Sequence, residues 1–220
     1  MKIVACIEAR YSSTRLPGKM LADIEGKPLL VRVIDRVKKS KNVDEIIIAT
    51  STNILDKKIS DIAKSSNVKY FTGSEFDVLD RVVQANKSVK ADVVVEICGD
   101  CPLIDPILID KAIQTFLEND YDIVCTGGLT QTFPQGTEIM ILKTSLLEKS
   151  LQLSEEGPHR EHVGLFFLEN RNSDLSASVL LNINRVSEFI VLPILQTISG
   201  IFVIIFISIA VLFIAKLSAL

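Results

Sequence analysis

The sequence predicts an α/β fold, an open and mostly parallel sheet with helices on both faces. Short apolar runs, such as residues 3–7 and 92–98, alternate with segments whose apolar residues recur at helical spacing, such as 29–37 and 78–83. Strands that alternate with helices pair in parallel through right-handed crossovers. The ligand site of such a sheet is expected at the carboxyl ends of its strands.

The expected elements follow one another through the first 170 residues. The strands cover residues 3–7, 44–50, 68–71, 92–98 and 121–125, and the helices cover 29–37, 55–63, 78–83 and 106–116. Pro28 is suited to open the first helix. Asp105 is expected to cap the helix that begins at Pro106.

Composition excludes some classes of partner. The 24 basic and 27 acidic residues are nearly balanced, and the basic ones are scattered, so no nucleic-acid partner is expected. The four cysteines lie in or beside apolar runs and are interpreted as reduced, mostly buried thiols of a cytoplasmic protein. Residues 98–101 have the C-x-x-C form, so a redox or zinc role is the alternative.

A polar loop follows the first apolar run. Within residues 8–19 the cations Arg10, Arg15 and Lys19 are interleaved with the hydroxyls of residues 12–14, and the loop bends at Pro17 and Gly18. Guanidinium groups bind phosphate oxygens in pairs and lysine neutralises them, so the loop suits a polyphosphate. A solvated loop of ordinary charges is the alternative. The glycine fingerprints of dinucleotide-binding and P-loop proteins are both absent from this segment.

This loop resembles the signature loop of the cytidylyltransferases that activate acidic sugars. The matching residues are Ala9-Arg10 and Ser12 to Lys19, and the likeness is greatest to the spore-coat polysaccharide branch, beside the acylneuraminate and CMP-Kdo synthetase-like nucleotidyltransferases. The resemblance implies a Rossmann-like sheet of the nucleotide-diphospho-sugar transferase type. It also implies a nucleotide site for CTP, formed by Ala9, Arg10, Ser12, Thr14, Arg15, Lys19 and Gly99. Glu8 and Tyr11 depart from the family pattern, which commonly has glutamine and methionine there.

A second motif, Gly99 to Pro106, ends another apolar run. It resembles the Gly-Asp-x-Pro element with which this family holds magnesium. The resemblance makes Asp100 the metal ligand for Mg²⁺ and makes Arg15, Lys19 and Asp100 the catalytic residues. A purely structural turn before a helix is the alternative.

Two later segments resemble the sugar-binding part of the family. Glu138 follows a Pro-x-Gly segment, and Met140 stands where a second acid is usual; a surface hairpin is the alternative. Residues 160–163 read Arg-Glu-His-Val, which resembles a family run beside the sugar-binding and dimer-forming region. The resemblance makes Glu138, Arg160 and His162 the substrate-binding candidates, with a solvated helix face as the alternative, and it allows a homodimer.

The composition changes after Asp174. Only Arg185, Glu188 and Lys216 are charged beyond it, and residues 189–215 carry no charge. As a helix, 27 residues reach roughly 40 Å, more than the hydrocarbon core of a bilayer. We therefore expect a nucleotidyltransferase-like domain at 1–172, a linker at 173–188 and a candidate transmembrane helix at 189–216. The tail loosely resembles a transmembrane helix of an ABC exporter, and a buried core helix is the alternative.

The resemblance implies a cytidylyltransferase that transfers CMP from CTP to a sugar, expected to be acidic, for surface polysaccharide biosynthesis. The catalytic domain would be cytoplasmic, and the protein membrane-associated if the tail inserts. The family's second metal-binding carboxylate follows a Val-Asp-Thr-like strand that has no counterpart here. The domain is therefore expected to be C-terminally truncated, and a catalytically impaired, membrane-tethered nucleotide-binding protein is the alternative function.

Overall fold

The computed structural model describes residues 1–13, 16–127, 133–155 and 157–169. The expected linker at 173–188 and hydrophobic helix at 189–216 lie outside these ranges, as does Asn182–Leu220, the second of two units into which the chain divides. Among the helices within these ranges, none has the length and apolar character needed to cross a bilayer.

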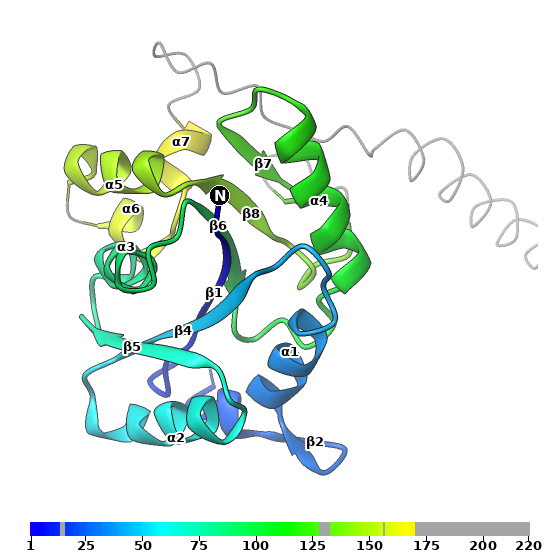
Figure 1. The fold of residues 1–220 in the computed structure, drawn as a ribbon. Helices are drawn as coiled ribbons and strands as arrows, with labels where there is room; N and C mark the ends of the chain where they lie inside the picture. Colours follow the sequence, from blue (N-terminus) through cyan, green and yellow to red (C-terminus); the bar gives the residue numbers. More distant parts are fainter. Residues whose placement is uncertain (14–15, 128–132, 156, 170–220) are drawn as a thin grey trace, which may run out of the picture. The chain divides into compact units, whose positions relative to one another are not determined.

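The described residues contain a six-stranded sheet with the order β5-β4-β1-β6-β8-β7, shown in Figure 1. Its strands are β1 (Ile3–Glu8), β4 (Glu45–Ser51), β5 (Lys69–Gly73), β6 (Val93–Cys98), β7 (Ile123–Cys125) and β8 (Met140–Lys143). The first four pair in parallel, which confirms the predicted mostly parallel α/β sheet. β8 runs antiparallel to both β6 and β7 and separates them, a strand that the sequence analysis did not assign.

The helices lie between the strands in sequence, as expected. They are α1 (Leu29–Val37), α2 (Lys57–Ser65), α3 (Val78–Ser88), α4 (Pro106–Glu118), α5 (Thr144–Leu153), α6 (Pro158–Glu161) and α7 (Leu165–Glu169), with 3₁₀ turns η1 (Lys19–Leu21) and η2 (Ile54–Asp56) and a small hairpin of β2 (Asp23–Ile24) and β3 (Lys27–Pro28). Asp105 caps α4 as predicted, because its Oδ1 accepts a hydrogen bond of 2.9 Å from the Ile107 amide.

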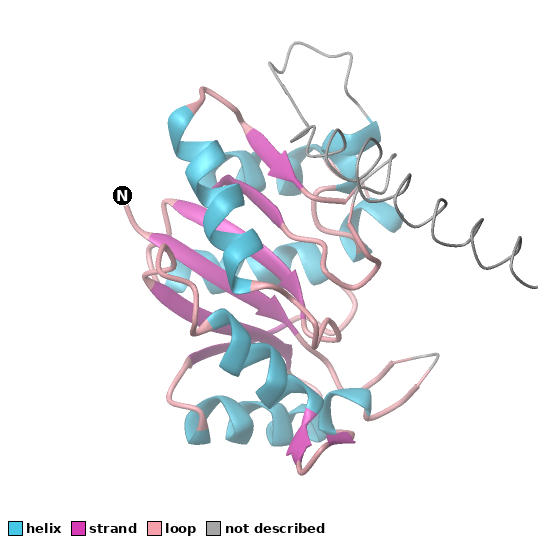
Figure 2. Cartoon of the chain, turned by 90° about the vertical axis from the view of Figure 1, so that its right-hand side faces the viewer, coloured by secondary structure: helices cyan, strands magenta, loops and turns pink. Residues whose placement is uncertain are grey.

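Two apolar cores lie on opposite faces of the sheet, and Figure 2 shows helices in front of and behind the strands. Side chains alternate between the faces of a strand. Ile3, Ala5 and Ile7 of β1 therefore pack in the core that includes residues of α1, α2 and α4. Val4 and Cys6 pack in the core that includes residues of α3 and α5. Both layers bury β1 and β6, which places the ends of these strands at a fixed position between the helices.

The carboxyl ends of β1 and β6 touch through their backbones. The Gly99 amide donates a hydrogen bond of 2.8 Å to the Glu8 carbonyl. A Cβ atom at Gly99 would lie 2.6 Å from that carbonyl oxygen, so only glycine fits without a shift of the backbone. The loops that follow the two strands are thereby held side by side.

Candidate active site

The loop after β1 is folded around Tyr11. The Tyr11 carbonyl accepts hydrogen bonds of 2.9 Å from both the Ser13 and Gly18 amides. Its amide donates a hydrogen bond of 2.5 Å to Oδ1 of the buried Asp56 at the end of η2. Gly18 has a φ of +75°, which favours glycine. These contacts bring Lys19 back to the sheet edge, whereas the predicted site residues Thr14 and Arg15 lie outside the described residues.

A cavity of about 240 Å³ lies at the carboxyl ends of β1 and β6. The predicted site residues that line it are Ala9, Arg10, Lys19, Gly99, Asp100 and His162. A larger cavity of about 680 Å³ lies at the opposite ends of the strands, where residues 43–46 and 67–69 line it, and it contains none of the predicted site residues. The smaller cavity is therefore the candidate active site, at the edge expected for a parallel sheet.

Lys19 and Asp100 form an ion pair in this cavity. The Lys19 Nζ atom contacts Oδ2 of Asp100, and the side chains are 19% and 36% exposed. Asp100 lies two residues after the end of β6, and its carboxylate lines the cavity at this strand end. An oxygen ligand that also faces open space fits Mg²⁺, which proteins hold through one or two carboxylates together with substrate phosphates.

A second set of contacts fixes the start of the loop. Ser12 Oγ donates a hydrogen bond of 2.6 Å to Oε1 of Glu75, and Asn53 donates one of 3.0 Å to Oε2. These two bonds lower the pKa of the Glu75 carboxyl. Arg10 donates to the Glu75 carbonyl at 3.3 Å and lies 3.5 Å from Oε1 of Glu161. Arg10 and its partner Glu161 line the cavity, whereas Ser12, bonded to Glu75, does not.

The three substrate-binding candidates are not gathered in one place. His162 lines the cavity. Arg160 donates hydrogen bonds to Oδ2 of Asp77 at 2.8 Å and to the Ser154 carbonyl at 3.1 Å, and it is not among the lining residues. Glu138 accepts a hydrogen bond of 2.7 Å from the Gly136 amide and is also not among them. The structure thus brings His162 to the site and gives Arg160 and Glu138 other contacts.

Among the cavity-lining residues that were not predicted as site residues, two charged groups stand out. Arg81 lies on α3 and is 1% exposed, and it lines the cavity together with Glu8. Burial raises the pKa of the Glu8 carboxyl, and the positive charge of Arg81 opposes this rise. The sequence carries a signal for Arg81, because it stands among the apolar residues 78–83 of an expected helix. Glu8 was noticed only as a departure from the family pattern.

Comparisons with known proteins identify the family of this chain. The profile of the family described as cytidylyltransferase matches residues 4–183. The chain belongs to the cytidylyltransferase family. It is thus a nucleotidyltransferase by family, and the recognition made from the loop and the Gly-Asp motif is confirmed. The comparisons give no support to the resemblance proposed for the tail.

Two curated relatives and one solved structure are similar to this cytidylyltransferase. The spore coat polysaccharide biosynthesis protein SpsF of Bacillus subtilis is 34% identical over 175 residues, 74% of this chain and 69% of SpsF. The 3-deoxy-manno-octulosonate cytidylyltransferase of Chloroherpeton thalassium is 45% identical over 121 residues, and the chain spans about half of its length, 48%. A cytidylyltransferase structure from Leptospira borgpetersenii has a TM-score of 0.74 at 34% identity, covering 78% of this chain and 72% of that one.

Proposed function

We propose that this cytidylyltransferase transfers CMP from CTP to a hydroxyl group of a sugar and releases pyrophosphate. The sugar oxygen forms a bond to the α-phosphorus, the bond from that phosphorus to the bridging oxygen of the β-phosphate breaks, and the hydroxyl proton is released. The observation that carries the proposal is the cavity at the ends of β1 and β6, which gathers Arg10, Lys19 and Asp100. Phosphoryl transfer depends mainly on positioning and charge stabilisation, so the site needs no nucleophilic side chain.

The loop after β1 is proposed to hold the triphosphate. Lys19 and Arg10 line the cavity and supply positive charge. Thr14 and Arg15 of the same loop are proposed to bind phosphate oxygens as well, whereas Ser12, whose hydroxyl is bonded to Glu75, would hold the loop in place. Gly99 has no side chain between the β1 backbone and the cavity, which leaves room for the nucleotide to approach together with Ala9.

The Lys19–Asp100 pair is proposed to exchange its partners when the nucleotide binds. Asp100 would hold Mg²⁺, and Lys19 would turn to the phosphate oxygens, so each charge gains a new opposite charge as the old contact breaks. Mg²⁺, when bound, would neutralise charge on the triphosphate. Lys19 would offset the charge that develops on the leaving pyrophosphate, because a lysine is a mobile point charge.

The sugar is proposed to enter beside His162. This residue lines the same cavity and offers a ring nitrogen for a hydroxyl. The names of the relatives, spore coat polysaccharide biosynthesis and 3-deoxy-manno-octulosonate, support an acidic sugar destined for a surface polysaccharide. Arg160 is proposed to act from outside the cavity, by holding α6 in place.

The test is pyrophosphate release by the full chain with Mg²⁺. Each of the four nucleoside triphosphates is supplied with a panel of acidic sugars and with their neutral counterparts. Release is expected with CTP and an acidic sugar. Turnover with ATP or GTP alone would overturn the cytidine assignment, and turnover with neutral sugars alone would overturn the acidic-sugar assignment.

The second candidate function is a membrane-tethered protein that binds CTP without turning it over. It is favoured by the sequence observation that Asp100 has no second carboxylate partner of the family type, since both ligands help to hold the ion. The uncharged run at 189–215 would supply the tether, with the catalytic domain on the cytosolic side where CTP is found. CTP binding without pyrophosphate release, together with recovery in the membrane fraction, would favour this candidate.

A further inference from the structure

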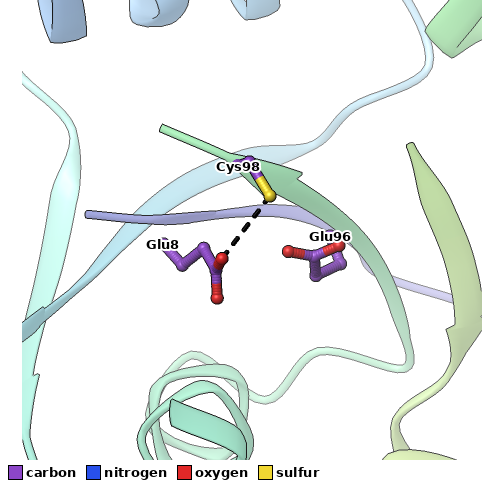
Figure 3. Close-up of side chains that lie close together, drawn as sticks. All are labelled: Glu8, Glu96 and Cys98. Atoms are coloured by element: carbon purple, nitrogen blue, oxygen red, sulfur yellow. Dashed lines mark hydrogen bonds between the residues drawn. The ribbon is translucent and has the colours of Figure 1, made fainter. Parts of the chain in front are cut away.

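Three side chains that can bind a metal lie together beside the cavity. They are Glu8 of β1 and Glu96 and Cys98 of β6, and one ligand atom from each lies within 4.8 Å of the others. The strand register explains the cluster, because Glu8 pairs with Cys98, and Glu96 precedes Cys98 by two residues and so points to the same face. Figure 3 shows the Glu96 carboxylate beside the Cys98 sulfur and facing the Glu8 side chain.

Each carboxylate of this cluster has at least one oxygen without a hydrogen-bond donor. Oε1 of Glu8 accepts a hydrogen bond of 3.5 Å from the Cys98 thiol, the dashed line in Figure 3. Oε2 of Glu8 is buried and has no hydrogen-bond partner. Glu96 is 9% exposed, and no hydrogen bond to its carboxylate is found within the described part of the chain. A buried charge without a partner is costly, so such groups are paired with opposite charge or coordinate a metal. The cluster is therefore built like a cation site.

We propose that Glu8, Glu96 and Cys98 bind a divalent cation of intermediate softness, of which Zn²⁺ is the representative. This ion would be additional to the Mg²⁺ proposed at Asp100. Carboxylate and thiolate donors are typical ligands of Zn²⁺, whereas Mg²⁺ prefers oxygen alone. The Cys98 thiol would lose its proton on binding, as would a carboxyl that carries one, and these protons pass to solvent.

The charges balance when such an ion is present. Two carboxylates and one thiolate contribute three negative charges, and the ion contributes two positive ones. The third positive charge is the guanidinium of Arg81, which is buried on α3, interacts with Glu8, and has an Nε atom without a hydrogen-bond partner. Without the ion, burial and repulsion by the Glu8 carboxylate raise the pKa of the Glu96 carboxyl well above its usual range.

The geometry requires only a short adjustment. Bonds of about 2.0–2.3 Å place tetrahedral Zn²⁺ ligands roughly 3.3–3.8 Å apart, which is within reach of side chains whose ligand atoms already lie within 4.8 Å. Glu8 and Cys98 also line the cavity, which gives the ion a path of entry and leaves room for a fourth ligand such as water. Structural zinc sites are closed, almost always by four protein ligands. The site proposed here has three protein ligands and access from the cavity, so it keeps an open coordination position.

The proposal is tested with Co²⁺, which substitutes for Zn²⁺ and gives a thiolate-to-metal absorption band. The full chain is purified in detergent because of its apolar run, stripped with a chelator and titrated with Co²⁺, with Mg²⁺ present in excess. One equivalent is expected to bind with the thiolate band, and Zn²⁺ is expected to displace it. Cys98→Ser is expected to abolish the band, and Glu96→Gln and Glu8→Gln are each expected to weaken binding by at least about tenfold.

Three controls make the test specific. Cys125→Ser changes a buried cysteine on β7 and is expected to keep the band, and Asp100→Asn is expected to keep it because the sites are separate. Cys101→Ser is also expected to keep it. Near-ultraviolet circular dichroism of each stripped variant establishes that it is folded. Absence of the band in the wild-type protein would overturn the proposal. The carboxyls of Glu8 and Glu96 would then form a buried pair that holds protons in place of a metal ion. A band that survives both glutamate substitutions but is lost in Cys101→Ser would overturn it in favour of a cysteine pair.

Discussion

The side chains of Lys19 and Asp100 are in contact although they are 81 residues apart in sequence. One belongs to the loop after β1 and the other to the turn after β6, and the parallel pairing of these two strands places them together. In this arrangement each group masks the charge of the other. Access of a metal ion to Asp100 and of a phosphate to Lys19 should therefore depend on each other.

The first prediction follows from this pair. Asp100→Asn should abolish the Mg²⁺ dependence of CTP binding and lower pyrophosphate release by at least about 100-fold, because a single stabilising group at such a site contributes this much. Calorimetric titration with and without Mg²⁺ measures the effect. Asp105→Asn is the matched control, because asparagine caps a helix as well as aspartate and Asp105 does not line the cavity. Equal behaviour of the two variants would contradict the role of Asp100.

The second prediction concerns Arg15, which belongs in sequence to the loop after β1. Arg15→Ala should weaken CTP binding by at least about tenfold, and Arg15→Lys should restore only part of it, because lysine lacks the paired donors of guanidinium. Isothermal calorimetry checks both. Lys39→Ala removes an exposed cation beyond the end of α1 and controls for a general loss of positive charge. If all of these proteins bind CTP equally, the loop is an ordinary solvated one.

Gly99 allows a prediction about stability. Gly99→Ala should lower the free energy of unfolding by about 1–3 kcal/mol, because the new methyl group would lie 2.6 Å from the Glu8 carbonyl and the strand ends would have to move apart. CTP binding should weaken with it. Urea unfolding measures the first effect and calorimetry the second. A variant of unchanged stability would show that the two strand ends can separate freely.

Glu75 predicts a pH dependence of folding. Its pKa is lowered by hydrogen bonds from Ser12 and Asn53, so below about pH 4.5 the unfolded state takes up its proton first. The stabilisation is therefore present above about pH 4.5 and is lost as the pH falls through the lowered pKa. Glu75→Gln should unfold more readily than the wild type at pH 7, and this difference should shrink at pH 3. The exposed Glu155→Gln serves as control, and thermal unfolding across this range measures it.

The core of the fold was predictable because its signals are local. The apolar runs of β1 and β6 and the helical spacing of α1 and α3 are readable in single segments, and parallel pairing then places the site at the strand ends. β8 was missed because it has only four residues and its place depends on pairing with β6 and β7. Its apolar residues carry no signal of direction, so an antiparallel strand between two others could not be inferred.

The candidate site was predicted only in part, because a sequence motif is readable only where its residues lie close together in the chain. Motifs identified Lys19 and Asp100, which the structure brings together. They could not identify partners supplied by distant segments. Asp77, which holds Arg160, lies 83 residues from it in sequence. Arg81 reaches Glu8 only because α3 packs on the face where Glu8 points. Such contacts arise from packing and leave no spacing pattern in the chain.

The last prediction separates two roles for Arg160. If it holds α6 against the cap of α3, Arg160→Ala and Asp77→Asn should each lower the free energy of unfolding. The loss in the double variant should be smaller than the sum of the two single losses, by up to about 1 kcal/mol because the ion pair is partly exposed. Asparagine keeps the helix cap of α3, so Asp77→Asn removes only the charge. Both variants should raise KM for the sugar by similar factors, since each displaces His162. If Arg160 instead binds the sugar, Arg160→Ala alone would raise KM and the two effects on stability would add. Urea unfolding and sugar titrations of all four proteins of the cycle decide between these roles.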